Sequence, residues 1–228
     1  MVKKIALTLA ALAGLLQGSL CCHAETYDYG LGIISYPSTQ EQMTGVALEG
    51  GQEFRPKGSP FTISFSVYTR PENVFGTIMR IITDKGDNVD LGYTARRDDV
   101  RNPMLVNGEY VTDLQIPAPI GRWADVSITL DSRTGNVDLL FDGCPLSIRD
   151  AGTKSAKGFK VYFGLCPDKE YRLDDVASVD IKDVEVSFGD KLVRRWSMGV
   201  HEDKICYDDL AHSPAVTRNP RWLLDKCK

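Results

Sequence analysis

The sequence lacks two patterns that would place it in common protein classes. Amphipathic helical periodicity is almost absent from the 228 residues, and Lys and Arg (27) are outnumbered by Asp and Glu (31), for a formal net charge of −4. Without amphipathic helices a parallel α/β fold is excluded, because its helices alternate with strands. Without a basic run or a basic and aromatic stripe, nucleic acid is not the expected partner.

Long hydrophobic runs are also missing, except at the N-terminus. Lys3 and Lys4 precede the apolar run 5–16, which is too short to span a bilayer, and Ala24 is a small residue suited to cleavage. We predict a signal peptide over residues 1–24 and an exported protein that is periplasmic, at the cell surface or secreted. No transmembrane segment is expected after cleavage. A retained anchor, or lipid attachment at Cys21 or Cys22, is the less favoured alternative.

Cysteines are few and do not have metal-site spacing. Beyond residue 24 only Cys144, Cys166, Cys206 and Cys227 occur, and no C-x-x-C pair is among them. An even number of cysteines in an exported protein is typical of disulfides, and four cysteines allow three pairings. We predict Cys144–Cys166 and Cys206–Cys227, with free thiols as the alternative.

What the sequence does contain is alternation of apolar and polar residues. Residues 122–145 predict a hairpin whose turn spans Asp131 to Asn136 and which is followed by a second turn at Asp142-Gly143. Its core-facing residues are expected to be Val126, Ile128, Val137, Leu139 and Phe141. Further strands are expected over 61–69, 75–83, 88–95, 159–164 and 178–196. The fold class is therefore all-β, an antiparallel β-sandwich of jelly-roll type over residues 25–200, with a C-terminal tail over 201–228 packed on it.

One strand changes phase along its length. Val179 and Ile181 share one face, whereas Val184 and Val186 have the opposite phase, with Asp183 at the change. A β-bulge at Asp183 explains such a shift.

The three tryptophans are expected to be structural. Trp123 and Trp196 are predicted to point into the core, and Trp222 to anchor the tail on the sandwich.

Several segments resemble a known family. "RWADVSITLDSRTGNVDLLFDG" resembles a hairpin of laminin G-like and concanavalin A-like jelly rolls, and "VASVDIKDVEVSFGDKL" resembles the strand that closes that fold. In order, "YGLGIISY", "GVALEGGQEFRP", "FTISFSVYTRPENVFGTIMRI" and "NPRWLLD" are similar to the N-terminal concanavalin A-like domain of bacterial surface proteins that usually carry a following Kelch β-propeller. The resemblance covers nearly all of residues 29–225. Since the chain ends at Lys228, it implies either a free-standing version or the remnant of a longer protein.

Catalytic signatures of this fold are missing. Retaining β-glucanases carry E-x-D-x-x-E on one strand, and the nearest group here, Asp180, Asp183 and Glu185, has the wrong spacing. No G-x-S-x-G motif occurs, and no histidine has a recognisable nucleophile. We predict that the chain is not an enzyme. A diverged glycoside hydrolase or lyase, using Asp183 or a carboxylate within 84–101, remains the alternative.

The loop around residues 93–102 is a candidate ligand site. It combines an aromatic ring, on which a sugar could stack, with planar hydrogen-bonding groups: Tyr93, Arg96, Arg97, Asp98, Asp99 and Arg101. A solvated charged loop would have the same composition, and that interpretation stays open.

A neighbouring turn is a candidate calcium site. Oxygen ligands are available from Asp84, Asp87, Asn88 and Asp90, although the D-x-D-x-D-G pattern of an EF-hand is absent. Turns favour Asp and Asn for conformational reasons too. No other cofactor is predicted.

Taken together, these patterns predict an exported, non-catalytic binding module that recognises carbohydrate or a surface protein. The alternatives are the diverged enzyme and a structural accessory domain.

Overall fold

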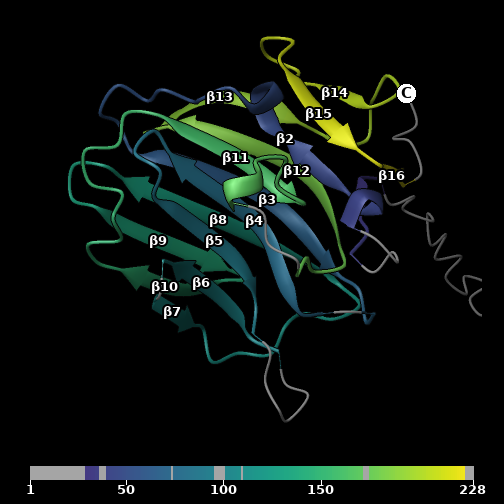
Figure 1. The fold of residues 1–228 in the computed structure, drawn as a ribbon, viewed down its shortest axis with the longest axis horizontal. Coiled ribbons are helices and arrows are strands. Elements are labelled where there is room, and N and C mark those ends of the chain that lie inside the picture. Colours follow the sequence, from purple (N-terminus) through teal and green to yellow (C-terminus); the bar gives the residue numbers. More distant parts are fainter. Residues whose placement is uncertain are drawn as a thin grey trace, which may run out of the picture.

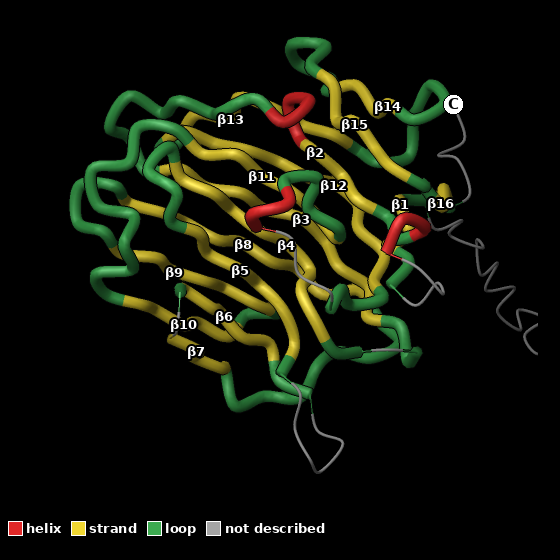
Figure 2. Tube along the Cα trace, viewed as in Figure 1, coloured by secondary structure: helices red, strands yellow, loops and turns green. Residues whose placement is uncertain are grey.

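The alternating segments of the sequence pair into two antiparallel β-sheets that lie face to face (Figure 1). The computed structural model describes residues 29–35, 40–72, 74–94, 101–108, 110–171 and 175–223. Within these ranges the helical structure is confined to short 3-10 turns, η1 (Gln40–Gln42), η2 (Leu48–Gly51) and η3 (Lys169–Tyr171) (Figure 2). None of the helices in these ranges has the length and apolar character needed to cross a bilayer. The predicted all-β sandwich is confirmed.

The first sheet contains the hairpin recognised in the sequence. Its strand order is β10 (Cys144–Ile148), β9 (Asn136–Phe141), β8 (Trp123–Asp131), β3 (Phe61–Thr69), β12 (Val179–Phe188), β1 (Leu31–Ile33) and β16 (Arg221–Trp222), and β13 (Lys191–Trp196) also pairs with β12. Asp142 and Gly143 both have positive φ, 50° and 79°, and join β9 to β10. Asp-Gly is the pair that such a two-residue turn prefers.

The second sheet contains segments from the whole length of the described chain. Its order is β14 (Ile205–Tyr207), β15 (Pro214–Arg218), β2 (Gly45–Ala47), β11 (Phe159–Gly164), β4 (Gly76–Thr83), β5 (Asn88–Tyr93), β6 (Pro103–Asn107) and β7 (Tyr110–Asp113). The expected strands 61–69 and 159–164 have the observed bounds. The strands that the sequence does not predict are β1, β2, β6, β7, β10, β14, β15 and β16.

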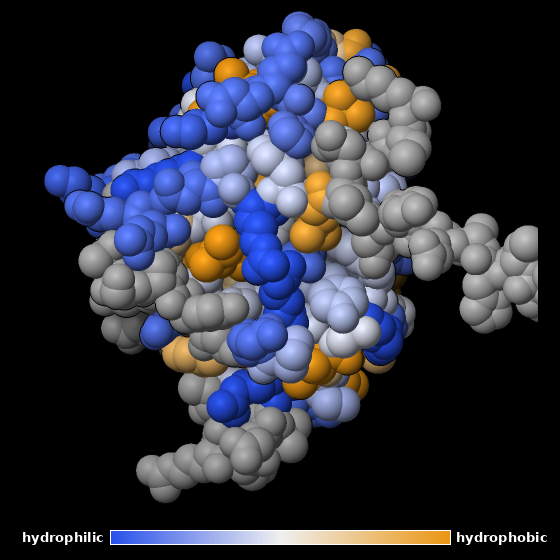
Figure 3. All heavy atoms as spheres, turned by 90° about the vertical axis from the view of Figure 1, so that its right-hand side faces the viewer, coloured by the Kyte–Doolittle hydropathy of each residue, from blue (hydrophilic) through white to orange (hydrophobic). Residues whose placement is uncertain are grey.

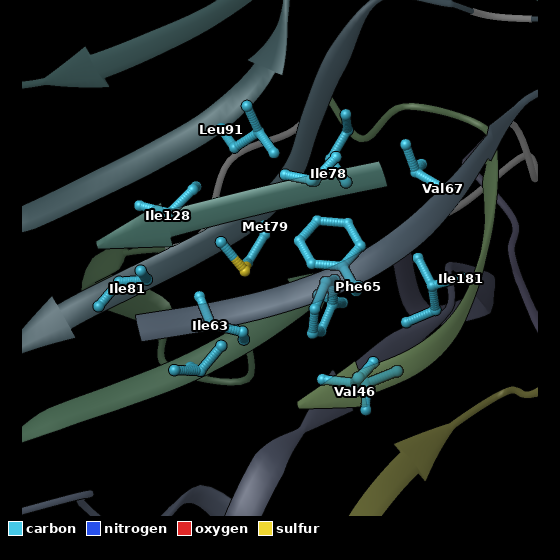
Figure 4. Packing of buried hydrophobic residues seen from close by; sticks show 14 of the residues in the cluster. Val46, Ile63, Phe65, Val67, Ile78, Met79, Ile81, Leu91, Ile128 and Ile181 are labelled. Atoms are coloured by element: carbon cyan, nitrogen blue, oxygen red, sulfur yellow. The ribbon is translucent and has the colours of Figure 1, made fainter. Parts of the chain in front are cut away.

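The core lies between the sheets and consists of the apolar residues of the alternating segments. All five hairpin residues expected in it are at most 2% exposed: Val126, Ile128, Val137, Leu139 and Phe141. Figure 4 shows side chains of both sheets interdigitating, with Ile63 and Phe65 of β3 beside Met79 and Ile81 of β4. Burial of this continuous apolar layer provides the main driving force for folding.

The C-terminal residues take part in both sheets. The sequence predicts a tail packed on the sandwich from residue 201, but β14 and β15 extend the second sheet and β16 pairs with β1 in the first. Trp222 packs against the core, stacks on His201 with 3.9 Å between ring centroids, and donates a hydrogen bond from Nε1 to the Asp203 carbonyl.

The predicted β-bulge in β12 is confirmed. Register with β3 shifts between Lys182 and Glu185, and Asp183 has a φ of 51°. The Asp183 carboxylate accepts a hydrogen bond from the hydroxyl of Tyr29, at 2.7 Å to each oxygen. This contact between residues far apart in the chain fixes the segment before β1 to the bulge.

We expect Ile128→Ala to lower the free energy of unfolding by about 2–5 kcal/mol, because the side chain is fully buried and its loss leaves a cavity. The matched variant is Thr129→Ala on the outer face, whose hydroxyl is hydrogen-bonded to that of Thr62; it should cost about 1 kcal/mol or less. Urea unfolding of both variants measures the difference. Equal costs would contradict the assignment of the two faces.

The Tyr29–Asp183 contact predicts a pH dependence of stability. Burial, and then the hydrogen bond and the charge of Asp183, raise the pKa of Tyr29 to about 12, whereas an unfolded tyrosine titrates near about 10. Because the folded state keeps its proton longer, the stabilisation is complete below about pH 10 and is lost as the pH rises through 12. Raising the pH between these two values should lower the melting temperature of Tyr29→Phe by less than it lowers that of the wild type. An unchanged alkaline profile would contradict the assignment.

Candidate functional site

The outer face of the first sheet carries a row of small polar side chains. On β3 and β8 they face each other in pairs: the hydroxyls of Thr62 and Thr129 lie 2.9 Å apart, Ser64 and Ser127 lie 3.4 Å apart, and Ser66 donates to Asp125 at 2.8 Å. Because side chains alternate between the two faces of a strand, the last pair on this outer face is Tyr68 and Trp123. Their rings meet edge to face with 5.6 Å between centroids.

Trp123 is therefore not a core residue, and the prediction that it points inward is wrong. It is half-exposed, whereas Ala124, Val126, Ile128 and Leu130 are buried. The signal was present in the sequence, because Trp123 lies an odd number of positions from Val126 and shares its phase with Asp125, Ser127 and Thr129. Trp196 is fully buried, as predicted.

The aromatic pair borders an open cleft. The cleft has a volume of about 440 Å³ and is lined by Tyr68, Arg70, Pro71, Glu72, Trp123, Asp180 and Leu223. These residues come from the end of β3 and the loop that follows it, the start of β8, the start of β12 and the residue after β16. Four segments far apart in the chain thus meet at one end of the first sheet.

Charged groups in this cleft are held in fixed positions. Arg70 donates from Nε and one terminal nitrogen to Asp180 Oδ1 at 2.9 and 2.7 Å, and the two side chains are 18% and 8% exposed. An arginine and a carboxylate in such contact are rigid, planar hydrogen-bonding groups.

A lysine lies over one face of the Trp123 ring and one face of the Tyr29 ring, next to the cleft. Lys182 Nζ lies 4.0 Å from the ring centroid of Trp123 and 5.1 Å from that of Tyr29. An ammonium over an indole is stabilised by the ring's negative face. The bulge at Asp183 follows Lys182 directly, so the backbone irregularity and the orientation of this lysine belong to one local arrangement.

The outer face of the second sheet is less open around β4. Ile82, Tyr162 and Cys166 form a separate buried cluster with Tyr171 of η3 packed against it, and Tyr171 donates from its hydroxyl to the Gly86 carbonyl at 3.0 Å. Figure 2 shows η3 in front of these strands. Beside the cluster Arg80 binds both oxygens of Asp90, and both side chains are buried. The middle of this face is already occupied by the protein's own side chains.

Exposed apolar residues do not form a competing surface among the described residues. The large ones are dispersed over several segments: Tyr110, Val111, Ile120, Leu140, Val200, Leu210 and Val216. In Figure 3, which views the molecule from the right of Figure 1, the coloured hydrophobic atoms form patches separated by hydrophilic ones.

The predicted ligand loop is described only in part. Arg96, Arg97, Asp98 and Asp99 lie outside the described residues. Tyr93 is fully buried, its hydroxyl is hydrogen-bonded to that of Thr69, and burial raises its pKa well above the usual range, so its predicted role as a stacking surface is wrong. Arg101 is half-buried, and its carbonyl accepts a hydrogen bond from the Ala118 amide at 2.6 Å.

The predicted calcium ligands do not converge. Asp84 accepts a hydrogen bond from the Lys157 amide at 3.0 Å, Asp87 is exposed, and Asn88 donates to Asp90 at 3.1 Å. Asp90 is buried against the Arg80 guanidinium, which supplies the positive charge that calcium would. Over the described ranges no three His, Cys, Asp or Glu side chains are grouped as metal ligands. The structure gives this site no support.

The predicted disulfide between Cys144 and Cys166 is wrong. The two residues form no disulfide with each other, because Cys144 lies in edge strand β10 of the first sheet and Cys166 follows β11 and packs on the outer face of the second. The Cys206 thiol is buried, and mainly for that reason its pKa is raised to about 11. Its predicted partner Cys227 lies outside the described residues.

Comparison by sequence finds no protein-family model that matches this chain, and no curated protein matches it either. Solved structures do match. A heptameric SAP-like pentraxin from Limulus polyphemus has 18% identity and a TM-score of 0.51 over 70% of this chain and 76% of its own. A proposed carbohydrate-binding protein from Bacteroides ovatus has 16% identity and a TM-score of 0.54 over 87% of this chain and 60% of its own.

Mouse laminin α1 domains LG4-5 are also similar, with 18% identity and a TM-score of 0.47 over 78% of this chain and 49% of theirs. The similarity to domains that a Kelch β-propeller follows stays a prediction from the sequence. The pentraxin and the Bacteroides protein establish the fold alone, because their identities are low. With its two facing antiparallel sheets, the chain has an antiparallel β-sandwich fold of jelly-roll type, which it shares with these two proteins.

Proposed function

We propose that this chain is an exported, non-catalytic module that binds carbohydrate on the outer face of its first sheet, with the Trp123 cleft as the main contact. The observation that carries the proposal is the edge-to-face pair of Tyr68 and Trp123 beside the Arg70–Asp180 ion pair in an open cleft.

The chemistry of the cleft suits a sugar ring. The apolar face of a pyranose packs on an aromatic ring, and its hydroxyls need planar groups that both donate and accept hydrogen bonds. Arg70 can donate hydrogen bonds to a sugar, and Asp180 and Glu72 can accept them. Arg70 and Asp180 hold each other in position before any ligand binds. Such preorganisation lowers the entropic cost of binding. The hydroxyl pairs along β3 and β8 extend the polar surface away from the cleft, along which further sugar units could lie.

The structural similarity supports the proposal at the level of the fold. The Bacteroides ovatus protein has the same architecture and is itself proposed to bind carbohydrate. Jelly rolls also serve other functions, so the argument depends on the cleft of this chain rather than on the fold.

A role without catalysis is supported by the way the nearby carboxylates are used. Asp180 is bound to Arg70, and Asp183, which the sequence suggests for a diverged enzyme, accepts the Tyr29 hydroxyl. A glycosidase needs one carboxyl group as a proton donor and a second as nucleophile or base. Asp180 and Asp183 already have structural partners, which favours binding over hydrolysis.

We expect Trp123→Ala to weaken binding of a neutral oligosaccharide by about 10-fold, because the ring that stacks on the sugar is removed. Affinity gel electrophoresis with a panel of neutral polysaccharides first identifies the one that retards the protein most. Calorimetry then measures the affinity for an oligosaccharide derived from that polysaccharide.

The control is Tyr110→Ala, which removes an aromatic ring that is 77% exposed on edge strand β7 of the other sheet and should leave affinity unchanged. Equal losses in both variants would contradict the proposed cleft, and no retention by any polysaccharide would favour a protein partner or a structural role. If the protein releases reducing sugars from a polysaccharide and Asp183→Asn abolishes that release, the chain is a hydrolase instead.

A further inference from the structure

A second cleft lies at the opposite end of β3 and β8 from Trp123. It has a volume of about 660 Å³ and is formed by three loops: the one before β3, the β8–β9 turn and the one before β11. Its lining residues are Arg55, Lys57, Gly58, Ser132, Arg133, Ser155, Ala156 and Lys157. Because β3 has nine residues, this cleft is about 30 Å from the Trp123 cleft and is a separate site.

The charge of this cleft is opposite to that of the chain. Four of its lining residues are cationic and none is acidic, although the chain as a whole has a formal net charge of −4. Arg55 and Arg133 are ion-paired with Glu53 and Asp131 at 2.6 and 3.0 Å.

The two lysines of the cleft differ from the arginines. Lys57 and Lys157 are both exposed, and neither makes an ion pair with any residue that the structure describes. Each paired arginine keeps unused donors, and each lysine presents a full positive charge.

Hydrogen bonds fix the backbone of the loops that carry these lysines. Lys57 and Gly58 both have positive φ, 53° and 88°, and the Ser59 amide donates to the Pro56 carbonyl at 3.1 Å, so Lys57 lies at the tip of a tight turn. The Ser155 amide donates to the Ser132 carbonyl at 2.6 Å and joins the other two loops. The Lys157 amide donates to the Asp84 carboxylate at 3.0 Å. The backbone at each lysine is thus fixed by a hydrogen bond close by.

We propose that this cleft binds the anionic group of an acidic saccharide, a carboxylate or a sulfate ester, between Lys57 and Lys157. That the bound group is an anion follows from the positive charge of this cleft alone. That the anion belongs to a saccharide rests on the proposed function. The arginine guanidiniums suit planar carboxylates, and the hydroxyls of Ser132 and Ser155 line the same cleft for the sugar's polar groups. The chain then has two sites of different selectivity, a neutral aromatic one and a cationic one.

The test compares three tetrasaccharides by calorimetry with the full chain: galacturonic acid, its carboxyl-reduced neutral counterpart, and a sulfated galactose chain of the same length. We expect at least one acidic probe to bind about 10-fold more tightly than the neutral one, and Lys57→Gln with Lys157→Gln to abolish that difference. The acidic probe that binds identifies the source of the charge. Lys57→Arg with Lys157→Arg should preserve the binding.

The matched control is Lys191→Gln with Lys204→Gln, which removes the same charge from two exposed positions elsewhere. Equal losses in both glutamine pairs would show non-specific attraction and overturn the proposal, as would equal affinity for neutral and acidic probes. Trp123→Ala separates the two proposals. It should weaken binding of the neutral oligosaccharide and leave the difference in affinity between the acidic and the neutral probe unchanged. Thermal melts establish that all variants are folded; each replaced lysine is exposed.

Discussion

The alternation along β3 is the constraint on which the core and both clefts depend. Phe61, Ile63, Phe65 and Val67 are at most 3% exposed between the sheets, and a register shift of one residue would reverse every side chain of the strand. The same alternation places Thr62, Ser64, Ser66 and Tyr68 on the outer face. Since β3 lies between β8 and β12, its register with both neighbours determines which residues meet Tyr68 outside.

The two sheets use their outer faces differently, and packing explains why. On the second sheet, η3 and the cluster of Ile82, Tyr162 and Cys166 cover the region around β4, and the Arg80–Asp90 pair is buried there. Breaking such a pair would be costly, because one charge would be left buried without its partner. On the first sheet the outward residues of β3 and β8 are small, so they cannot fill the face themselves, and the aromatic pair at its end stays accessible.

The separation of Cys144 from Cys166 follows from the same architecture. Consecutive strands need not belong to one sheet: β10 is an edge strand of the first, and β11 lies within the second. Cys144 and Cys166 are therefore close in sequence and held in different layers. The fold does not need their covalent link, because the apolar faces of two large sheets cover one another.

The sequence by itself determined the features that depend on near neighbours. Alternation set the strands and the core of the hairpin, Asp142-Gly143 set the turn to β10, and the phase change at Asp183 set the bulge. The alternation also places Tyr68 and Trp123 on the polar face, although Trp123 is predicted to point into the core. Only the tertiary structure brought Arg70, Trp123 and Asp180 into one cleft, and Lys57, Arg133 and Lys157 into another. The physical reason is that a strand's faces are fixed by its own residues, whereas the order of strands in a sheet is fixed by pairings between residues distant in sequence.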